Sequence, residues 1–285
     1  MILVADSGST KADWKLAYRG KEMVTFNSIG LNPFFHDSNS VAATMQVIPQ
    51  VQQYANEVHR IEFFGAGCSH PARNKIISDG LQIVFPNAAI NIHHDLDAAA
   101  YATCNDKPGI ACILGTGSNS CYFDGTKVHE LNHGLGYILG DEGSGSFFGR
   151  KLLAYYLYKV MPDDLRTQFF ETYKVTKESI MQQVYYQPNA NVYLASFSRF
   201  LSVNTNHTFI TNLVSRGLGE FMDVNVCNIE NYKNVPVHFI GSIAYHFQNI
   251  LKQEAAKRSI TVGNIIAKPI ESLTQYFLEK ENLQK

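Results

Sequence analysis

The sequence contains two similar turns rich in Gly, Ser and Thr, and each directly follows an apolar, strand-like run. The first occupies residues 6–11, Asp-Ser-Gly-Ser-Thr-Lys, and the second residues 115–119, Gly-Thr-Gly-Ser-Asn. Small residues let backbone N–H groups converge on an anion, and hydroxyl groups add further donors. Two such turns on duplicated strands suggest a clamp that holds one polyphosphate from both sides. The pattern therefore favours a phosphotransferase that uses a nucleotide.

The first turn offers a metal ligand as well as phosphate donors. Asp6 immediately follows the strand, where its carboxylate could hold Mg²⁺ through water near the bridging phosphates. A strand-terminal Asp that only forms an Asx-turn is the alternative interpretation. A Walker A loop is absent, because its G-x-x-x-x-G-K-[ST] spacing does not occur here. The candidates for phosphate contacts are Ser7, Gly8, Ser9, Thr10 and Lys11 in the first turn, and Gly115, Thr116, Gly117 and Ser118 in the second.

Two aspartates follow the strand-like run 89–93. A carboxylate at the carboxyl end of a parallel strand is well placed to take a proton from an attacking hydroxyl. Asp95 is nearer the strand end and is the predicted general base. Asp97 is expected to cap the next helix or to face outward, and the alternative is that both acids merely start that helix.

Three further segments are candidates for ligand contacts. Asp141 and Glu142 stand between glycines in residues 140–145. Burying two adjacent carboxylates in an apolar core costs too much free energy for them to serve only in packing. They either cap the following helix or lie in a cleft and bind substrate hydroxyls or metal. Asn32 suits a sugar hydroxyl or amide, although a plain turn explains it equally well. Gly241-Ser242, between a strand and a helix, could let the chain approach an adenine or ribose.

These residues are expected on a duplicated α/β framework. In the first half, Pro49 should kink or split the helix expected over 38–57. Residues 106–109, Asp-Lys-Pro-Gly, form a turn and a domain boundary. The expected strands are a three-stranded meander over 2–27, then 61–65, 89–93, a second meander from 110 to about 131, 235–240 and 260–266. The other expected helices are 71–85, 96–104, 242–257 and 269–281, with a helical insertion over roughly 141–232.

Parallel strands that alternate with helices imply sheets covered on both faces, and two copies imply a cleft between domains. We therefore expect an N-terminal domain over residues 1–107 and a C-terminal domain over 108–285. As an alternative, the final helix, about 269–285, packs back on the first domain.

The composition excludes several classes of protein. The 285 residues carry a net charge of -1, so no polybasic field indicates nucleic acid or an anionic membrane. No apolar run approaches the roughly 20 residues needed to span a bilayer. The N-terminus lacks the features of a signal peptide, so a cytoplasmic location is expected. The five cysteines show no C-x-x-C spacing, which argues against a disulfide framework or a zinc site.

The motifs resemble those of a known superfamily. Residues 6–11, 115–119 and 241–242 are similar to the phosphate-1, phosphate-2 and adenosine motifs of the actin/hexokinase/Hsp70 superfamily. Residues 140–145 look like the signature of its N-acetylglucosamine kinase branch, in the BadF/BadG/BcrA/BcrD ATPase group. The resemblance covers almost the whole chain. It implies two actin-like (ribonuclease H-like) domains, an ATP and Mg²⁺ requirement, and transfer of the γ-phosphoryl to the 6-hydroxyl of an amino sugar, with N-acetylglucosamine as first choice.

The resemblance also implies roles for single residues. Asp95 would be the general base, Thr10 and Thr116 would contact phosphates, and Gly241 would lie by the adenosine. Animal relatives carry Asp-Ala-Ala at this helix start, which makes Asp97 the alternative base. The sugar site would be lined by Asn32, Asn119, Gly134, Leu135 and Asp141, with Leu135 in place of an aromatic residue of the animal enzymes.

Other functions remain as alternatives. A nucleotide or sugar sensor would keep the two turns without phosphoryl transfer. An ATPase of the BadF type would use cysteines to bind a bridging iron–sulfur cluster, and no convincing cysteine pair exists here. A homodimer is the expected assembly by similarity to related kinases.

Overall fold

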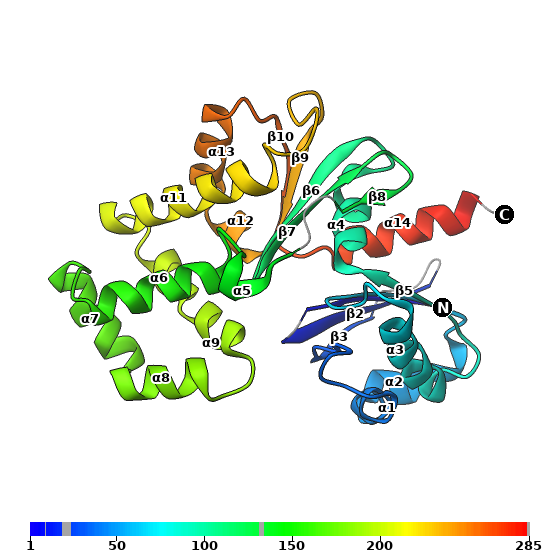
Figure 1. Ribbon diagram of the computed structural model, residues 1–285. Helices are drawn as coiled ribbons and strands as arrows, with labels where there is room; N and C mark the ends of the chain where they lie inside the picture. The colour runs from blue at the N-terminus through cyan, green and yellow to red at the C-terminus, as the bar shows by residue number, and fades with distance from the viewer. Residues whose placement is uncertain (9, 19–23, 131–133, 284–285) are drawn as a thin grey trace. The chain divides into compact units, whose positions relative to one another are not determined.

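The computed structural model describes residues 1–8, 10–18, 24–130 and 134–283 (Figure 1). The prediction for Ser9 therefore lies outside the described residues. The chain forms two compact units. Unit 1 comprises Met1–Asp106 and Lys268–Lys285, and unit 2 comprises Lys107–Ala267. Each unit contains its own five-stranded sheet.

The sheet of unit 1 combines an antiparallel meander with two parallel strands. Its order is β3-β2-β1-β4-β5, and β4 and β5 run parallel to β1. Leu3, Val4 and Ala5 of β1 are fully buried, because helices cover both faces of the sheet there. The strands are β1 (Ile2–Ser7), β2 (Lys11–Ala17), β3 (Val24–Ile29), β4 (Arg60–Gly65) and β5 (Ala89–His94).

Two groups of helices cover this sheet. On one face, the core contains Trp14 and Phe63, with Val41, Ile77 and Leu81 from the helices. On the other face, α4 and α14 pack against each other and against the central strands. As predicted, Pro49 splits the first helical stretch by starting a new helix. The helical segments are α1 (Ser38–Gln46), α2 (Pro49–Tyr54), η1 (Ala55–Glu57), α3 (Pro71–Val84), α4 (Asp95–Cys104) and α14 (Ile270–Leu283).

The sheet of unit 2 repeats the same topology. Its order is β10-β9-β6-β7-β8, with an antiparallel β6–β7–β8 meander and with β9 and β10 parallel. Unit 1 has the equivalent order around its own first strand, so the predicted duplication of the strand pattern is confirmed. The strands are β6 (Gly109–Leu114), β7 (Ser118–Phe123), β8 (Val128–His129), β9 (Val237–Ile240) and β10 (Val262–Ile266).

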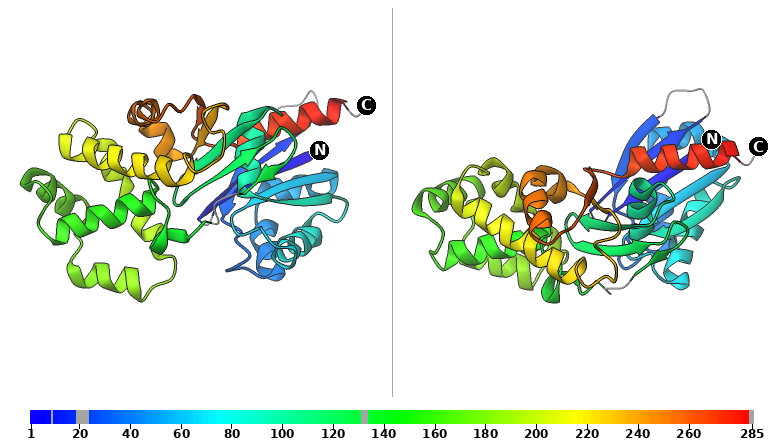
Figure 2. Two further views of the ribbon diagram at one scale, coloured as in Figure 1. Left: turned by 45° about the horizontal axis from the view of Figure 1, so that its top comes forward. Right: turned by 90° about the horizontal axis from the view of Figure 1, so that it is seen from above.

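A helical insertion between β8 and β9 builds most of the core of unit 2 (Figure 2). Its helices are α5 (Gly136–Leu139), α6 (Gly145–Leu157), α7 (Asp163–Tyr173), α8 (Lys177–Tyr185), α9 (Ala190–Ser196), α10 (Ser198–Val203) and α11 (Thr208–Asn225). After β9, the structure has two helices, α12 (Ser242–His246) and α13 (Gln248–Lys257), where the sequence predicts one. The break lies at Phe247, whose backbone leaves the helical region at φ −108° and ψ 24° while its ring stays buried.

Candidate functional site

The carboxyl ends of three neighbouring parallel strands meet at one edge of the unit 1 sheet. Ser7 of β1 pairs with Gly65 of β4, and Gly65 pairs with His94 of β5. Asp6 and Asp95 stand directly beside these paired residues in the sequence. This edge is where α/β sheets bind ligands.

Asp6 lies in a negative environment. Burial raises the pKa of this carboxyl to about 7, with further increases from the charges of Asp95 and Asp13 and an opposing effect from Lys268. The structure therefore places Asp6 close enough to Asp95 for their charges to interact. A cation stabilises the ionised form of a carboxyl whose pKa is raised by burial and by neighbouring acids.

The first turn is tightened by its own backbone. The N–H of Gly8 donates to the carbonyl of Lys11 (3.0 Å), and the carbonyl of Thr10 accepts from the N–H of Gly30 (3.0 Å). Gly8 and Thr10 are exposed. Ser7 was expected to contact phosphate, but it is buried, and its Oγ accepts from the N–H of Leu31 (2.9 Å). Its hydroxyl therefore ties the turn to the loop after β3, and a phosphate contact of Ser7 stays a prediction.

The two aspartates of α4 have different neighbours. Asp97 Oδ2 accepts a hydrogen bond from the N–H of His94 (3.0 Å), which makes Asp97 part of the helix cap. Asp95 Oδ1 lies 3.2 Å from His94 Nε2, and its side chain is about a third exposed. The cap that the sequence predicts for Asp97 is thus present.

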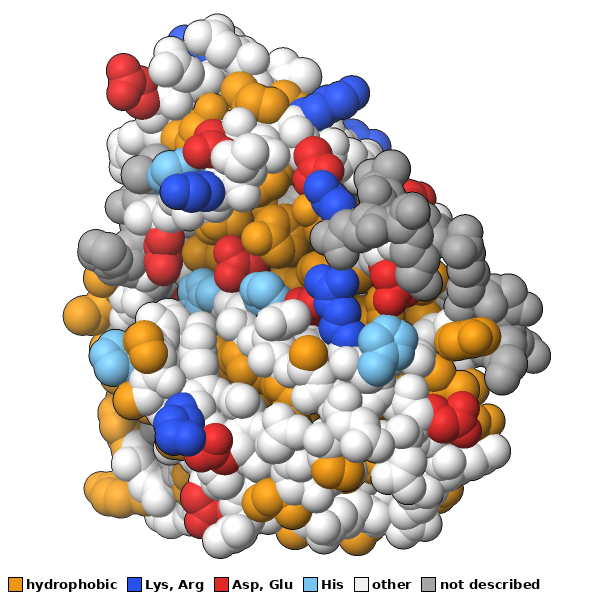
Figure 3. All heavy atoms as spheres, turned by 90° about the vertical axis from the view of Figure 1, so that its right-hand side faces the viewer, with side chains coloured by type: hydrophobic (Ala, Val, Ile, Leu, Met, Phe, Trp, Pro, Cys, Tyr) orange, Lys and Arg blue, Asp and Glu red, His pale blue; other side chains and the backbone are white. Residues whose placement is uncertain are grey.

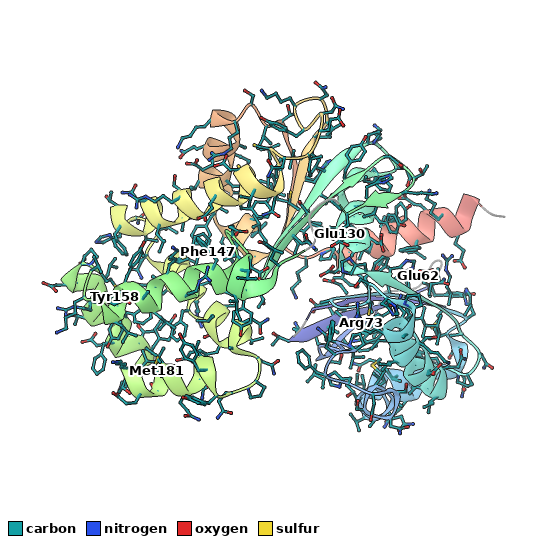
Figure 4. The ribbon with its side chains drawn as sticks, viewed as in Figure 1. Glu62, Arg73, Glu130, Phe147, Tyr158 and Met181 are labelled. Atoms are coloured by element: carbon teal, nitrogen blue, oxygen red, sulfur yellow. The ribbon has the colours of Figure 1, made fainter. Side chains whose placement is uncertain are left out.

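Asn32 lies buried beneath an aromatic loop. Its Oδ1 accepts from the N–H of Phe34 (3.0 Å), so part of its hydrogen-bonding capacity is used inside the loop. The guanidinium of Arg73 lies over the Phe34 ring, 4.6 Å from its centroid. Arg73 comes from the start of α3 (Figure 4). The loop after β4 approaches the loop after β3 closely at Gly67, because a Cβ there would lie 2.8 Å from Asn32 Oδ1.

The second turn in unit 2 is tied to the start of α6. The N–H groups of Gly145 and Ser146 donate to the carbonyls of Gly115 (2.8 Å) and Thr116 (3.0 Å). Within the turn, the N–H of Gly115 donates to the carbonyl of Gly117 (3.0 Å). A Cβ added at Gly115 would meet nothing within 4 Å, so the space beside this glycine is open.

Asp141 lies against this turn. Its Oδ1 accepts from the N–H of Ser118 (3.2 Å), and a Cβ on Gly117 would be 2.9 Å from its Oδ2. Burial raises the pKa of Asp141, with a smaller increase from Glu142, against the hydrogen bond from Ser118 that lowers it. Asp141 has a left-handed backbone (φ 59°), a conformation that costs energy and often marks functional positions. The cap of α6 is Ser144, so neither acid fulfils that role.

The other predicted sugar contacts in unit 2 lie beside the same turn. A Cβ on Gly134 would be 3.4 Å from Asn119 Nδ2, which places these two residues together. Leu135 follows and is 66% exposed, although leucine side chains are normally buried. It packs near Gly140, whose added Cβ would lie 3.0 Å from Leu135 Cβ.

Gly241 also lies against the second turn. β9 runs beside β6, so Gly241 at its end reaches the end of β6. Its φ is +118°, and a Cβ would lie 2.2 Å from the carbonyl oxygen of Leu114. Only glycine fits there. Ser242 follows as the first residue of α12.

Two residues near Asp6 were missed by the sequence analysis. Asp13 is the cross-strand partner of Asp6 in the β1–β2 hairpin, and Lys268 donates to Asp13 from the segment before α14. A hairpin that pairs Ser7 with Ala12 sets Asp6 opposite Asp13, so the register could have identified Asp13. No local signal identifies Lys268, because its partner is far away in the sequence.

The donor set suits a hydrated Mg²⁺ ion bound mainly by a nucleotide. Among the residues that the structure describes, no group of three or more His, Cys, Asp or Glu side chains could hold a metal ion. Mg²⁺ typically keeps several waters and takes one or two carboxylates plus substrate phosphates. Asp6 can supply one such carboxylate.

On the face shown in Figure 3, acidic and basic side chains are interspersed, in keeping with the net charge of -1. No helix in the described part of the chain is long and apolar enough to cross a bilayer.

Solved structures give the clearest comparisons. The "Putative N-acetylglucosamine Kinase" from Porphyromonas gingivalis is 39% identical, with a TM-score of 0.94 over 99% of this chain and 100% of that chain. The protein of the same description from Chromobacterium violaceum is 15% identical, with a TM-score of 0.74 over 96% and 98%. A ROK family glucokinase from Streptomyces griseus, in complex with glucose and AMPPNP, is 12% identical, with a TM-score of 0.55 over 96% and 97%.

The two more distant structures show the fold alone, which is the two-domain, actin-like fold of sugar kinases. Neither a protein-family model nor a curated protein sequence matches the chain. The likeness to the Porphyromonas protein extends to the sequence, at 39% identity over nearly the full length of both chains. It shows that this chain belongs to the N-acetylglucosamine kinase-like family of sugar kinases.

Proposed function

We propose that the protein transfers the γ-phosphoryl group of ATP to the 6-hydroxyl of an amino sugar, with N-acetylglucosamine as the first choice. The observation that supports this most directly is the pairing of two carboxylates at the carboxyl ends of β1 and β5. Asp6 precedes Ser7 and Asp95 follows His94, and both Ser7 and His94 pair with Gly65 of β4. A kinase needs one carboxylate for the cation and one for the proton of the acceptor.

In the proposed reaction, Asp95 accepts the proton of the sugar 6-hydroxyl as its oxygen attacks the γ-phosphorus. The bond between that phosphorus and the bridging oxygen breaks, and ADP leaves. Asp6 holds the hydrated Mg²⁺, which neutralises the charge of the phosphates when bound. Gly8, Thr10 and Lys11 contact phosphate on the same unit, and we retain Ser9 among these contacts from its sequence position.

Unit 2 supplies the remaining contacts of the proposal. Gly115, Thr116, Gly117 and Ser118 contact phosphate, and Gly241 and Ser242 lie by the adenosine. Asn119, Gly134, Leu135 and Asp141 bind the sugar, together with Asn32 of unit 1. The backbone hydrogen bonds between the second turn and the start of α6 support this assignment, because they hold the turn in place before any ligand binds. Membership of the BadF/BadG/BcrA/BcrD group, a homodimer and a cytoplasmic location belong to the same proposal.

Replacing the base tests the proposal. Asp95→Asn should lower kcat by at least about 100-fold, because general-base catalysis typically contributes factors of that order or more. ATP affinity, measured by calorimetry, should change little. The matched control is Asp97→Asn, which keeps the same helix turn and should retain most of the turnover while losing part of the cap. If Asp95→Asn keeps its turnover and Asp97→Asn loses it, Asp97 is the base.

A panel of amino sugars identifies the acceptor. ADP release is measured with N-acetylglucosamine, glucosamine, N-acetylmuramic acid and N-acetylmannosamine, and the phosphorylated carbon is assigned by NMR. We expect the highest kcat/KM with N-acetylglucosamine and phosphate on its 6-oxygen. ATP binding without transfer to any sugar would instead favour a sensor, and hydrolysis independent of sugar would favour an ATPase.

A further inference from the structure

Lys268 lies where the chain enters unit 1 for the second time. Unit 2 ends at Ala267, Lys268 follows, and α14 begins at Ile270. The Nζ of Lys268 is 3.0 Å from Asp13 Oδ2 and 3.2 Å from Asp13 Oδ1. The two residues are separated by most of the sequence, so this ion pair fixes the start of the C-terminal segment on the β1–β2 hairpin.

Asp13 holds a second ammonium group. The Nζ of Lys11, two residues earlier on β2, lies 3.0 Å from Asp13 Oδ1. The carboxylate of Asp13 is only 13% exposed, whereas the side chains of Lys11 and Lys268 are 49% and 57% exposed. A mostly buried acid therefore orients two cations that remain open to solvent. Asn27 from β3 also donates to Asp13, which holds the carboxylate in place.

This group faces the residue proposed to carry the metal. Asp6 and Asp13 are directly opposite in the antiparallel β1–β2 pair, so their side chains share one face of the sheet. The charge of Lys268 acts on Asp6 as well as on Asp13. Lys11, Asp13 and Lys268 thus form a charged cluster beside the first Gly-Ser-Thr turn.

We propose that Lys268 is a further phosphate-binding residue for the nucleotide and that Asp13 is the positioning residue that presents both lysines to it. This inference rests on the proposed use of ATP. A lysine ammonium is a common point-charge partner of phosphate. Holding it in place before binding reduces the conformational entropy lost when the ligand arrives.

Nucleotides that differ in phosphate number test the role of Lys268. The binding of ATP, ADP and AMP to the full-length protein is measured by calorimetry with Mg²⁺ and without sugar. Lys268→Met should weaken ATP and ADP binding about tenfold and leave AMP binding within about twofold of the wild type. Lys280→Met is the matched control, because it removes another exposed, ion-paired lysine of the same segment, and it should change none of the three affinities.

Asp13→Asn separates positioning from a general structural effect. It should give a loss restricted to ATP and ADP, and the double variant Asp13→Asn/Lys268→Met should be little worse than Lys268→Met alone. Thermal unfolding of each variant verifies that it is folded. Equal weakening of AMP and ATP, or unchanged ATP affinity in Lys268→Met, would overturn the inference. The test contains no sugar, so its outcome does not depend on which sugar the protein phosphorylates. Binding of ATP to the wild type verifies separately the use of ATP on which the inference rests.

Discussion

Two glycines at one end of the unit 2 sheet, Gly115 in the second turn and Gly241 after β9, differ in what the fold requires of them. A Cβ at Gly241 would collide with the carbonyl of Leu114, and the φ of +118° disfavours any L side chain. A Cβ at Gly115 would meet no protein atom within 4 Å. The fold therefore explains Gly241, whereas it gives no reason for Gly115. A ligand that approaches the backbone closely would give such a reason.

Gly115→Ala should therefore mainly affect ATP binding, whereas Gly241→Ala should mainly affect stability. Gly115→Ala should change the free energy of unfolding by less than about 1 kcal/mol and weaken ATP binding at least about tenfold. Gly241→Ala should cost about 2 kcal/mol or more, because strain and a backbone clash add. Chemical denaturation and nucleotide calorimetry provide the two measurements. If Gly115→Ala binds ATP normally, the second turn does not contact phosphate.

At this scale, the sequence predicted local features better than distant pairings. Asp97 caps its helix as expected, since a cap depends on neighbours within one turn. The hydroxyl of Ser7 accepts a hydrogen bond from Leu31, a partner in the loop after β3 that the turn sequence alone does not reveal. Lys268 could not be found, because it reaches Asp13 only after the whole chain has folded.

Among the elements, β4 and β5 carry a buried charged network. Glu62 is 1% exposed and accepts from Arg60 Nε (2.6 Å) and Asn91 Nδ2 (2.8 Å), while His93 Nε2 lies 2.6 Å from its Oε2. Burial alone would raise the pKa of Glu62, but the hydrogen bonds of His93 and Asn91 and the charge of Arg60 hold it below its usual value. Figure 4 labels Glu62 in this unit.

The lowered pKa makes the contribution of Glu62 to stability dependent on pH. A carboxyl with a lower pKa in the folded state stabilises above its unfolded pKa, about 4.3, and loses that contribution as pH falls through the folded value. Glu62→Gln should therefore cost about 1–3 kcal/mol at pH 7, with a smaller difference below about pH 4. Urea unfolding followed by Trp14 fluorescence measures both values. Glu57→Gln, on an exposed 3-10 turn of the same unit, is the control and should change the free energy of unfolding at pH 7 by less than about 0.5 kcal/mol.

The order of the elements was predictable, and their interruptions were less so. Pro49 marks its own break, because proline cannot continue a helix. The break at Phe247 has no such signal: the residues around it favour a continuous helix, and the burial of its ring in the core of unit 2 accompanies the break. Packing decides such a break, and packing is not visible in a single segment.

For the whole molecule, the path of the chain makes the two units unequal. Unit 2 is continuous, whereas unit 1 needs both ends of the chain. α14 contributes Ile270, Leu273 and Phe277 to the interior of unit 1, where Phe277 packs near Phe64 and Tyr101. Each unit also has its own hydrophobic core. Loss of the C-terminal segment should therefore affect unit 1 far more than unit 2.

Removal of residues 268–285 tests this with a built-in probe. Trp14, the single tryptophan of the chain, is fully buried in unit 1, while most helices belong to unit 2. Burial of each large apolar side chain is worth roughly 1.5–3 kcal/mol, so losing three approaches the stability of a typical domain. The truncated chain should lose the Trp14 fluorescence transition, or show it at a much lower temperature, while helical circular dichroism still melts near its original midpoint. Phe200→Ala, in the core of unit 2, should do the reverse. Equal shifts of both signals in both variants would mean that the two units unfold as one cooperative structure.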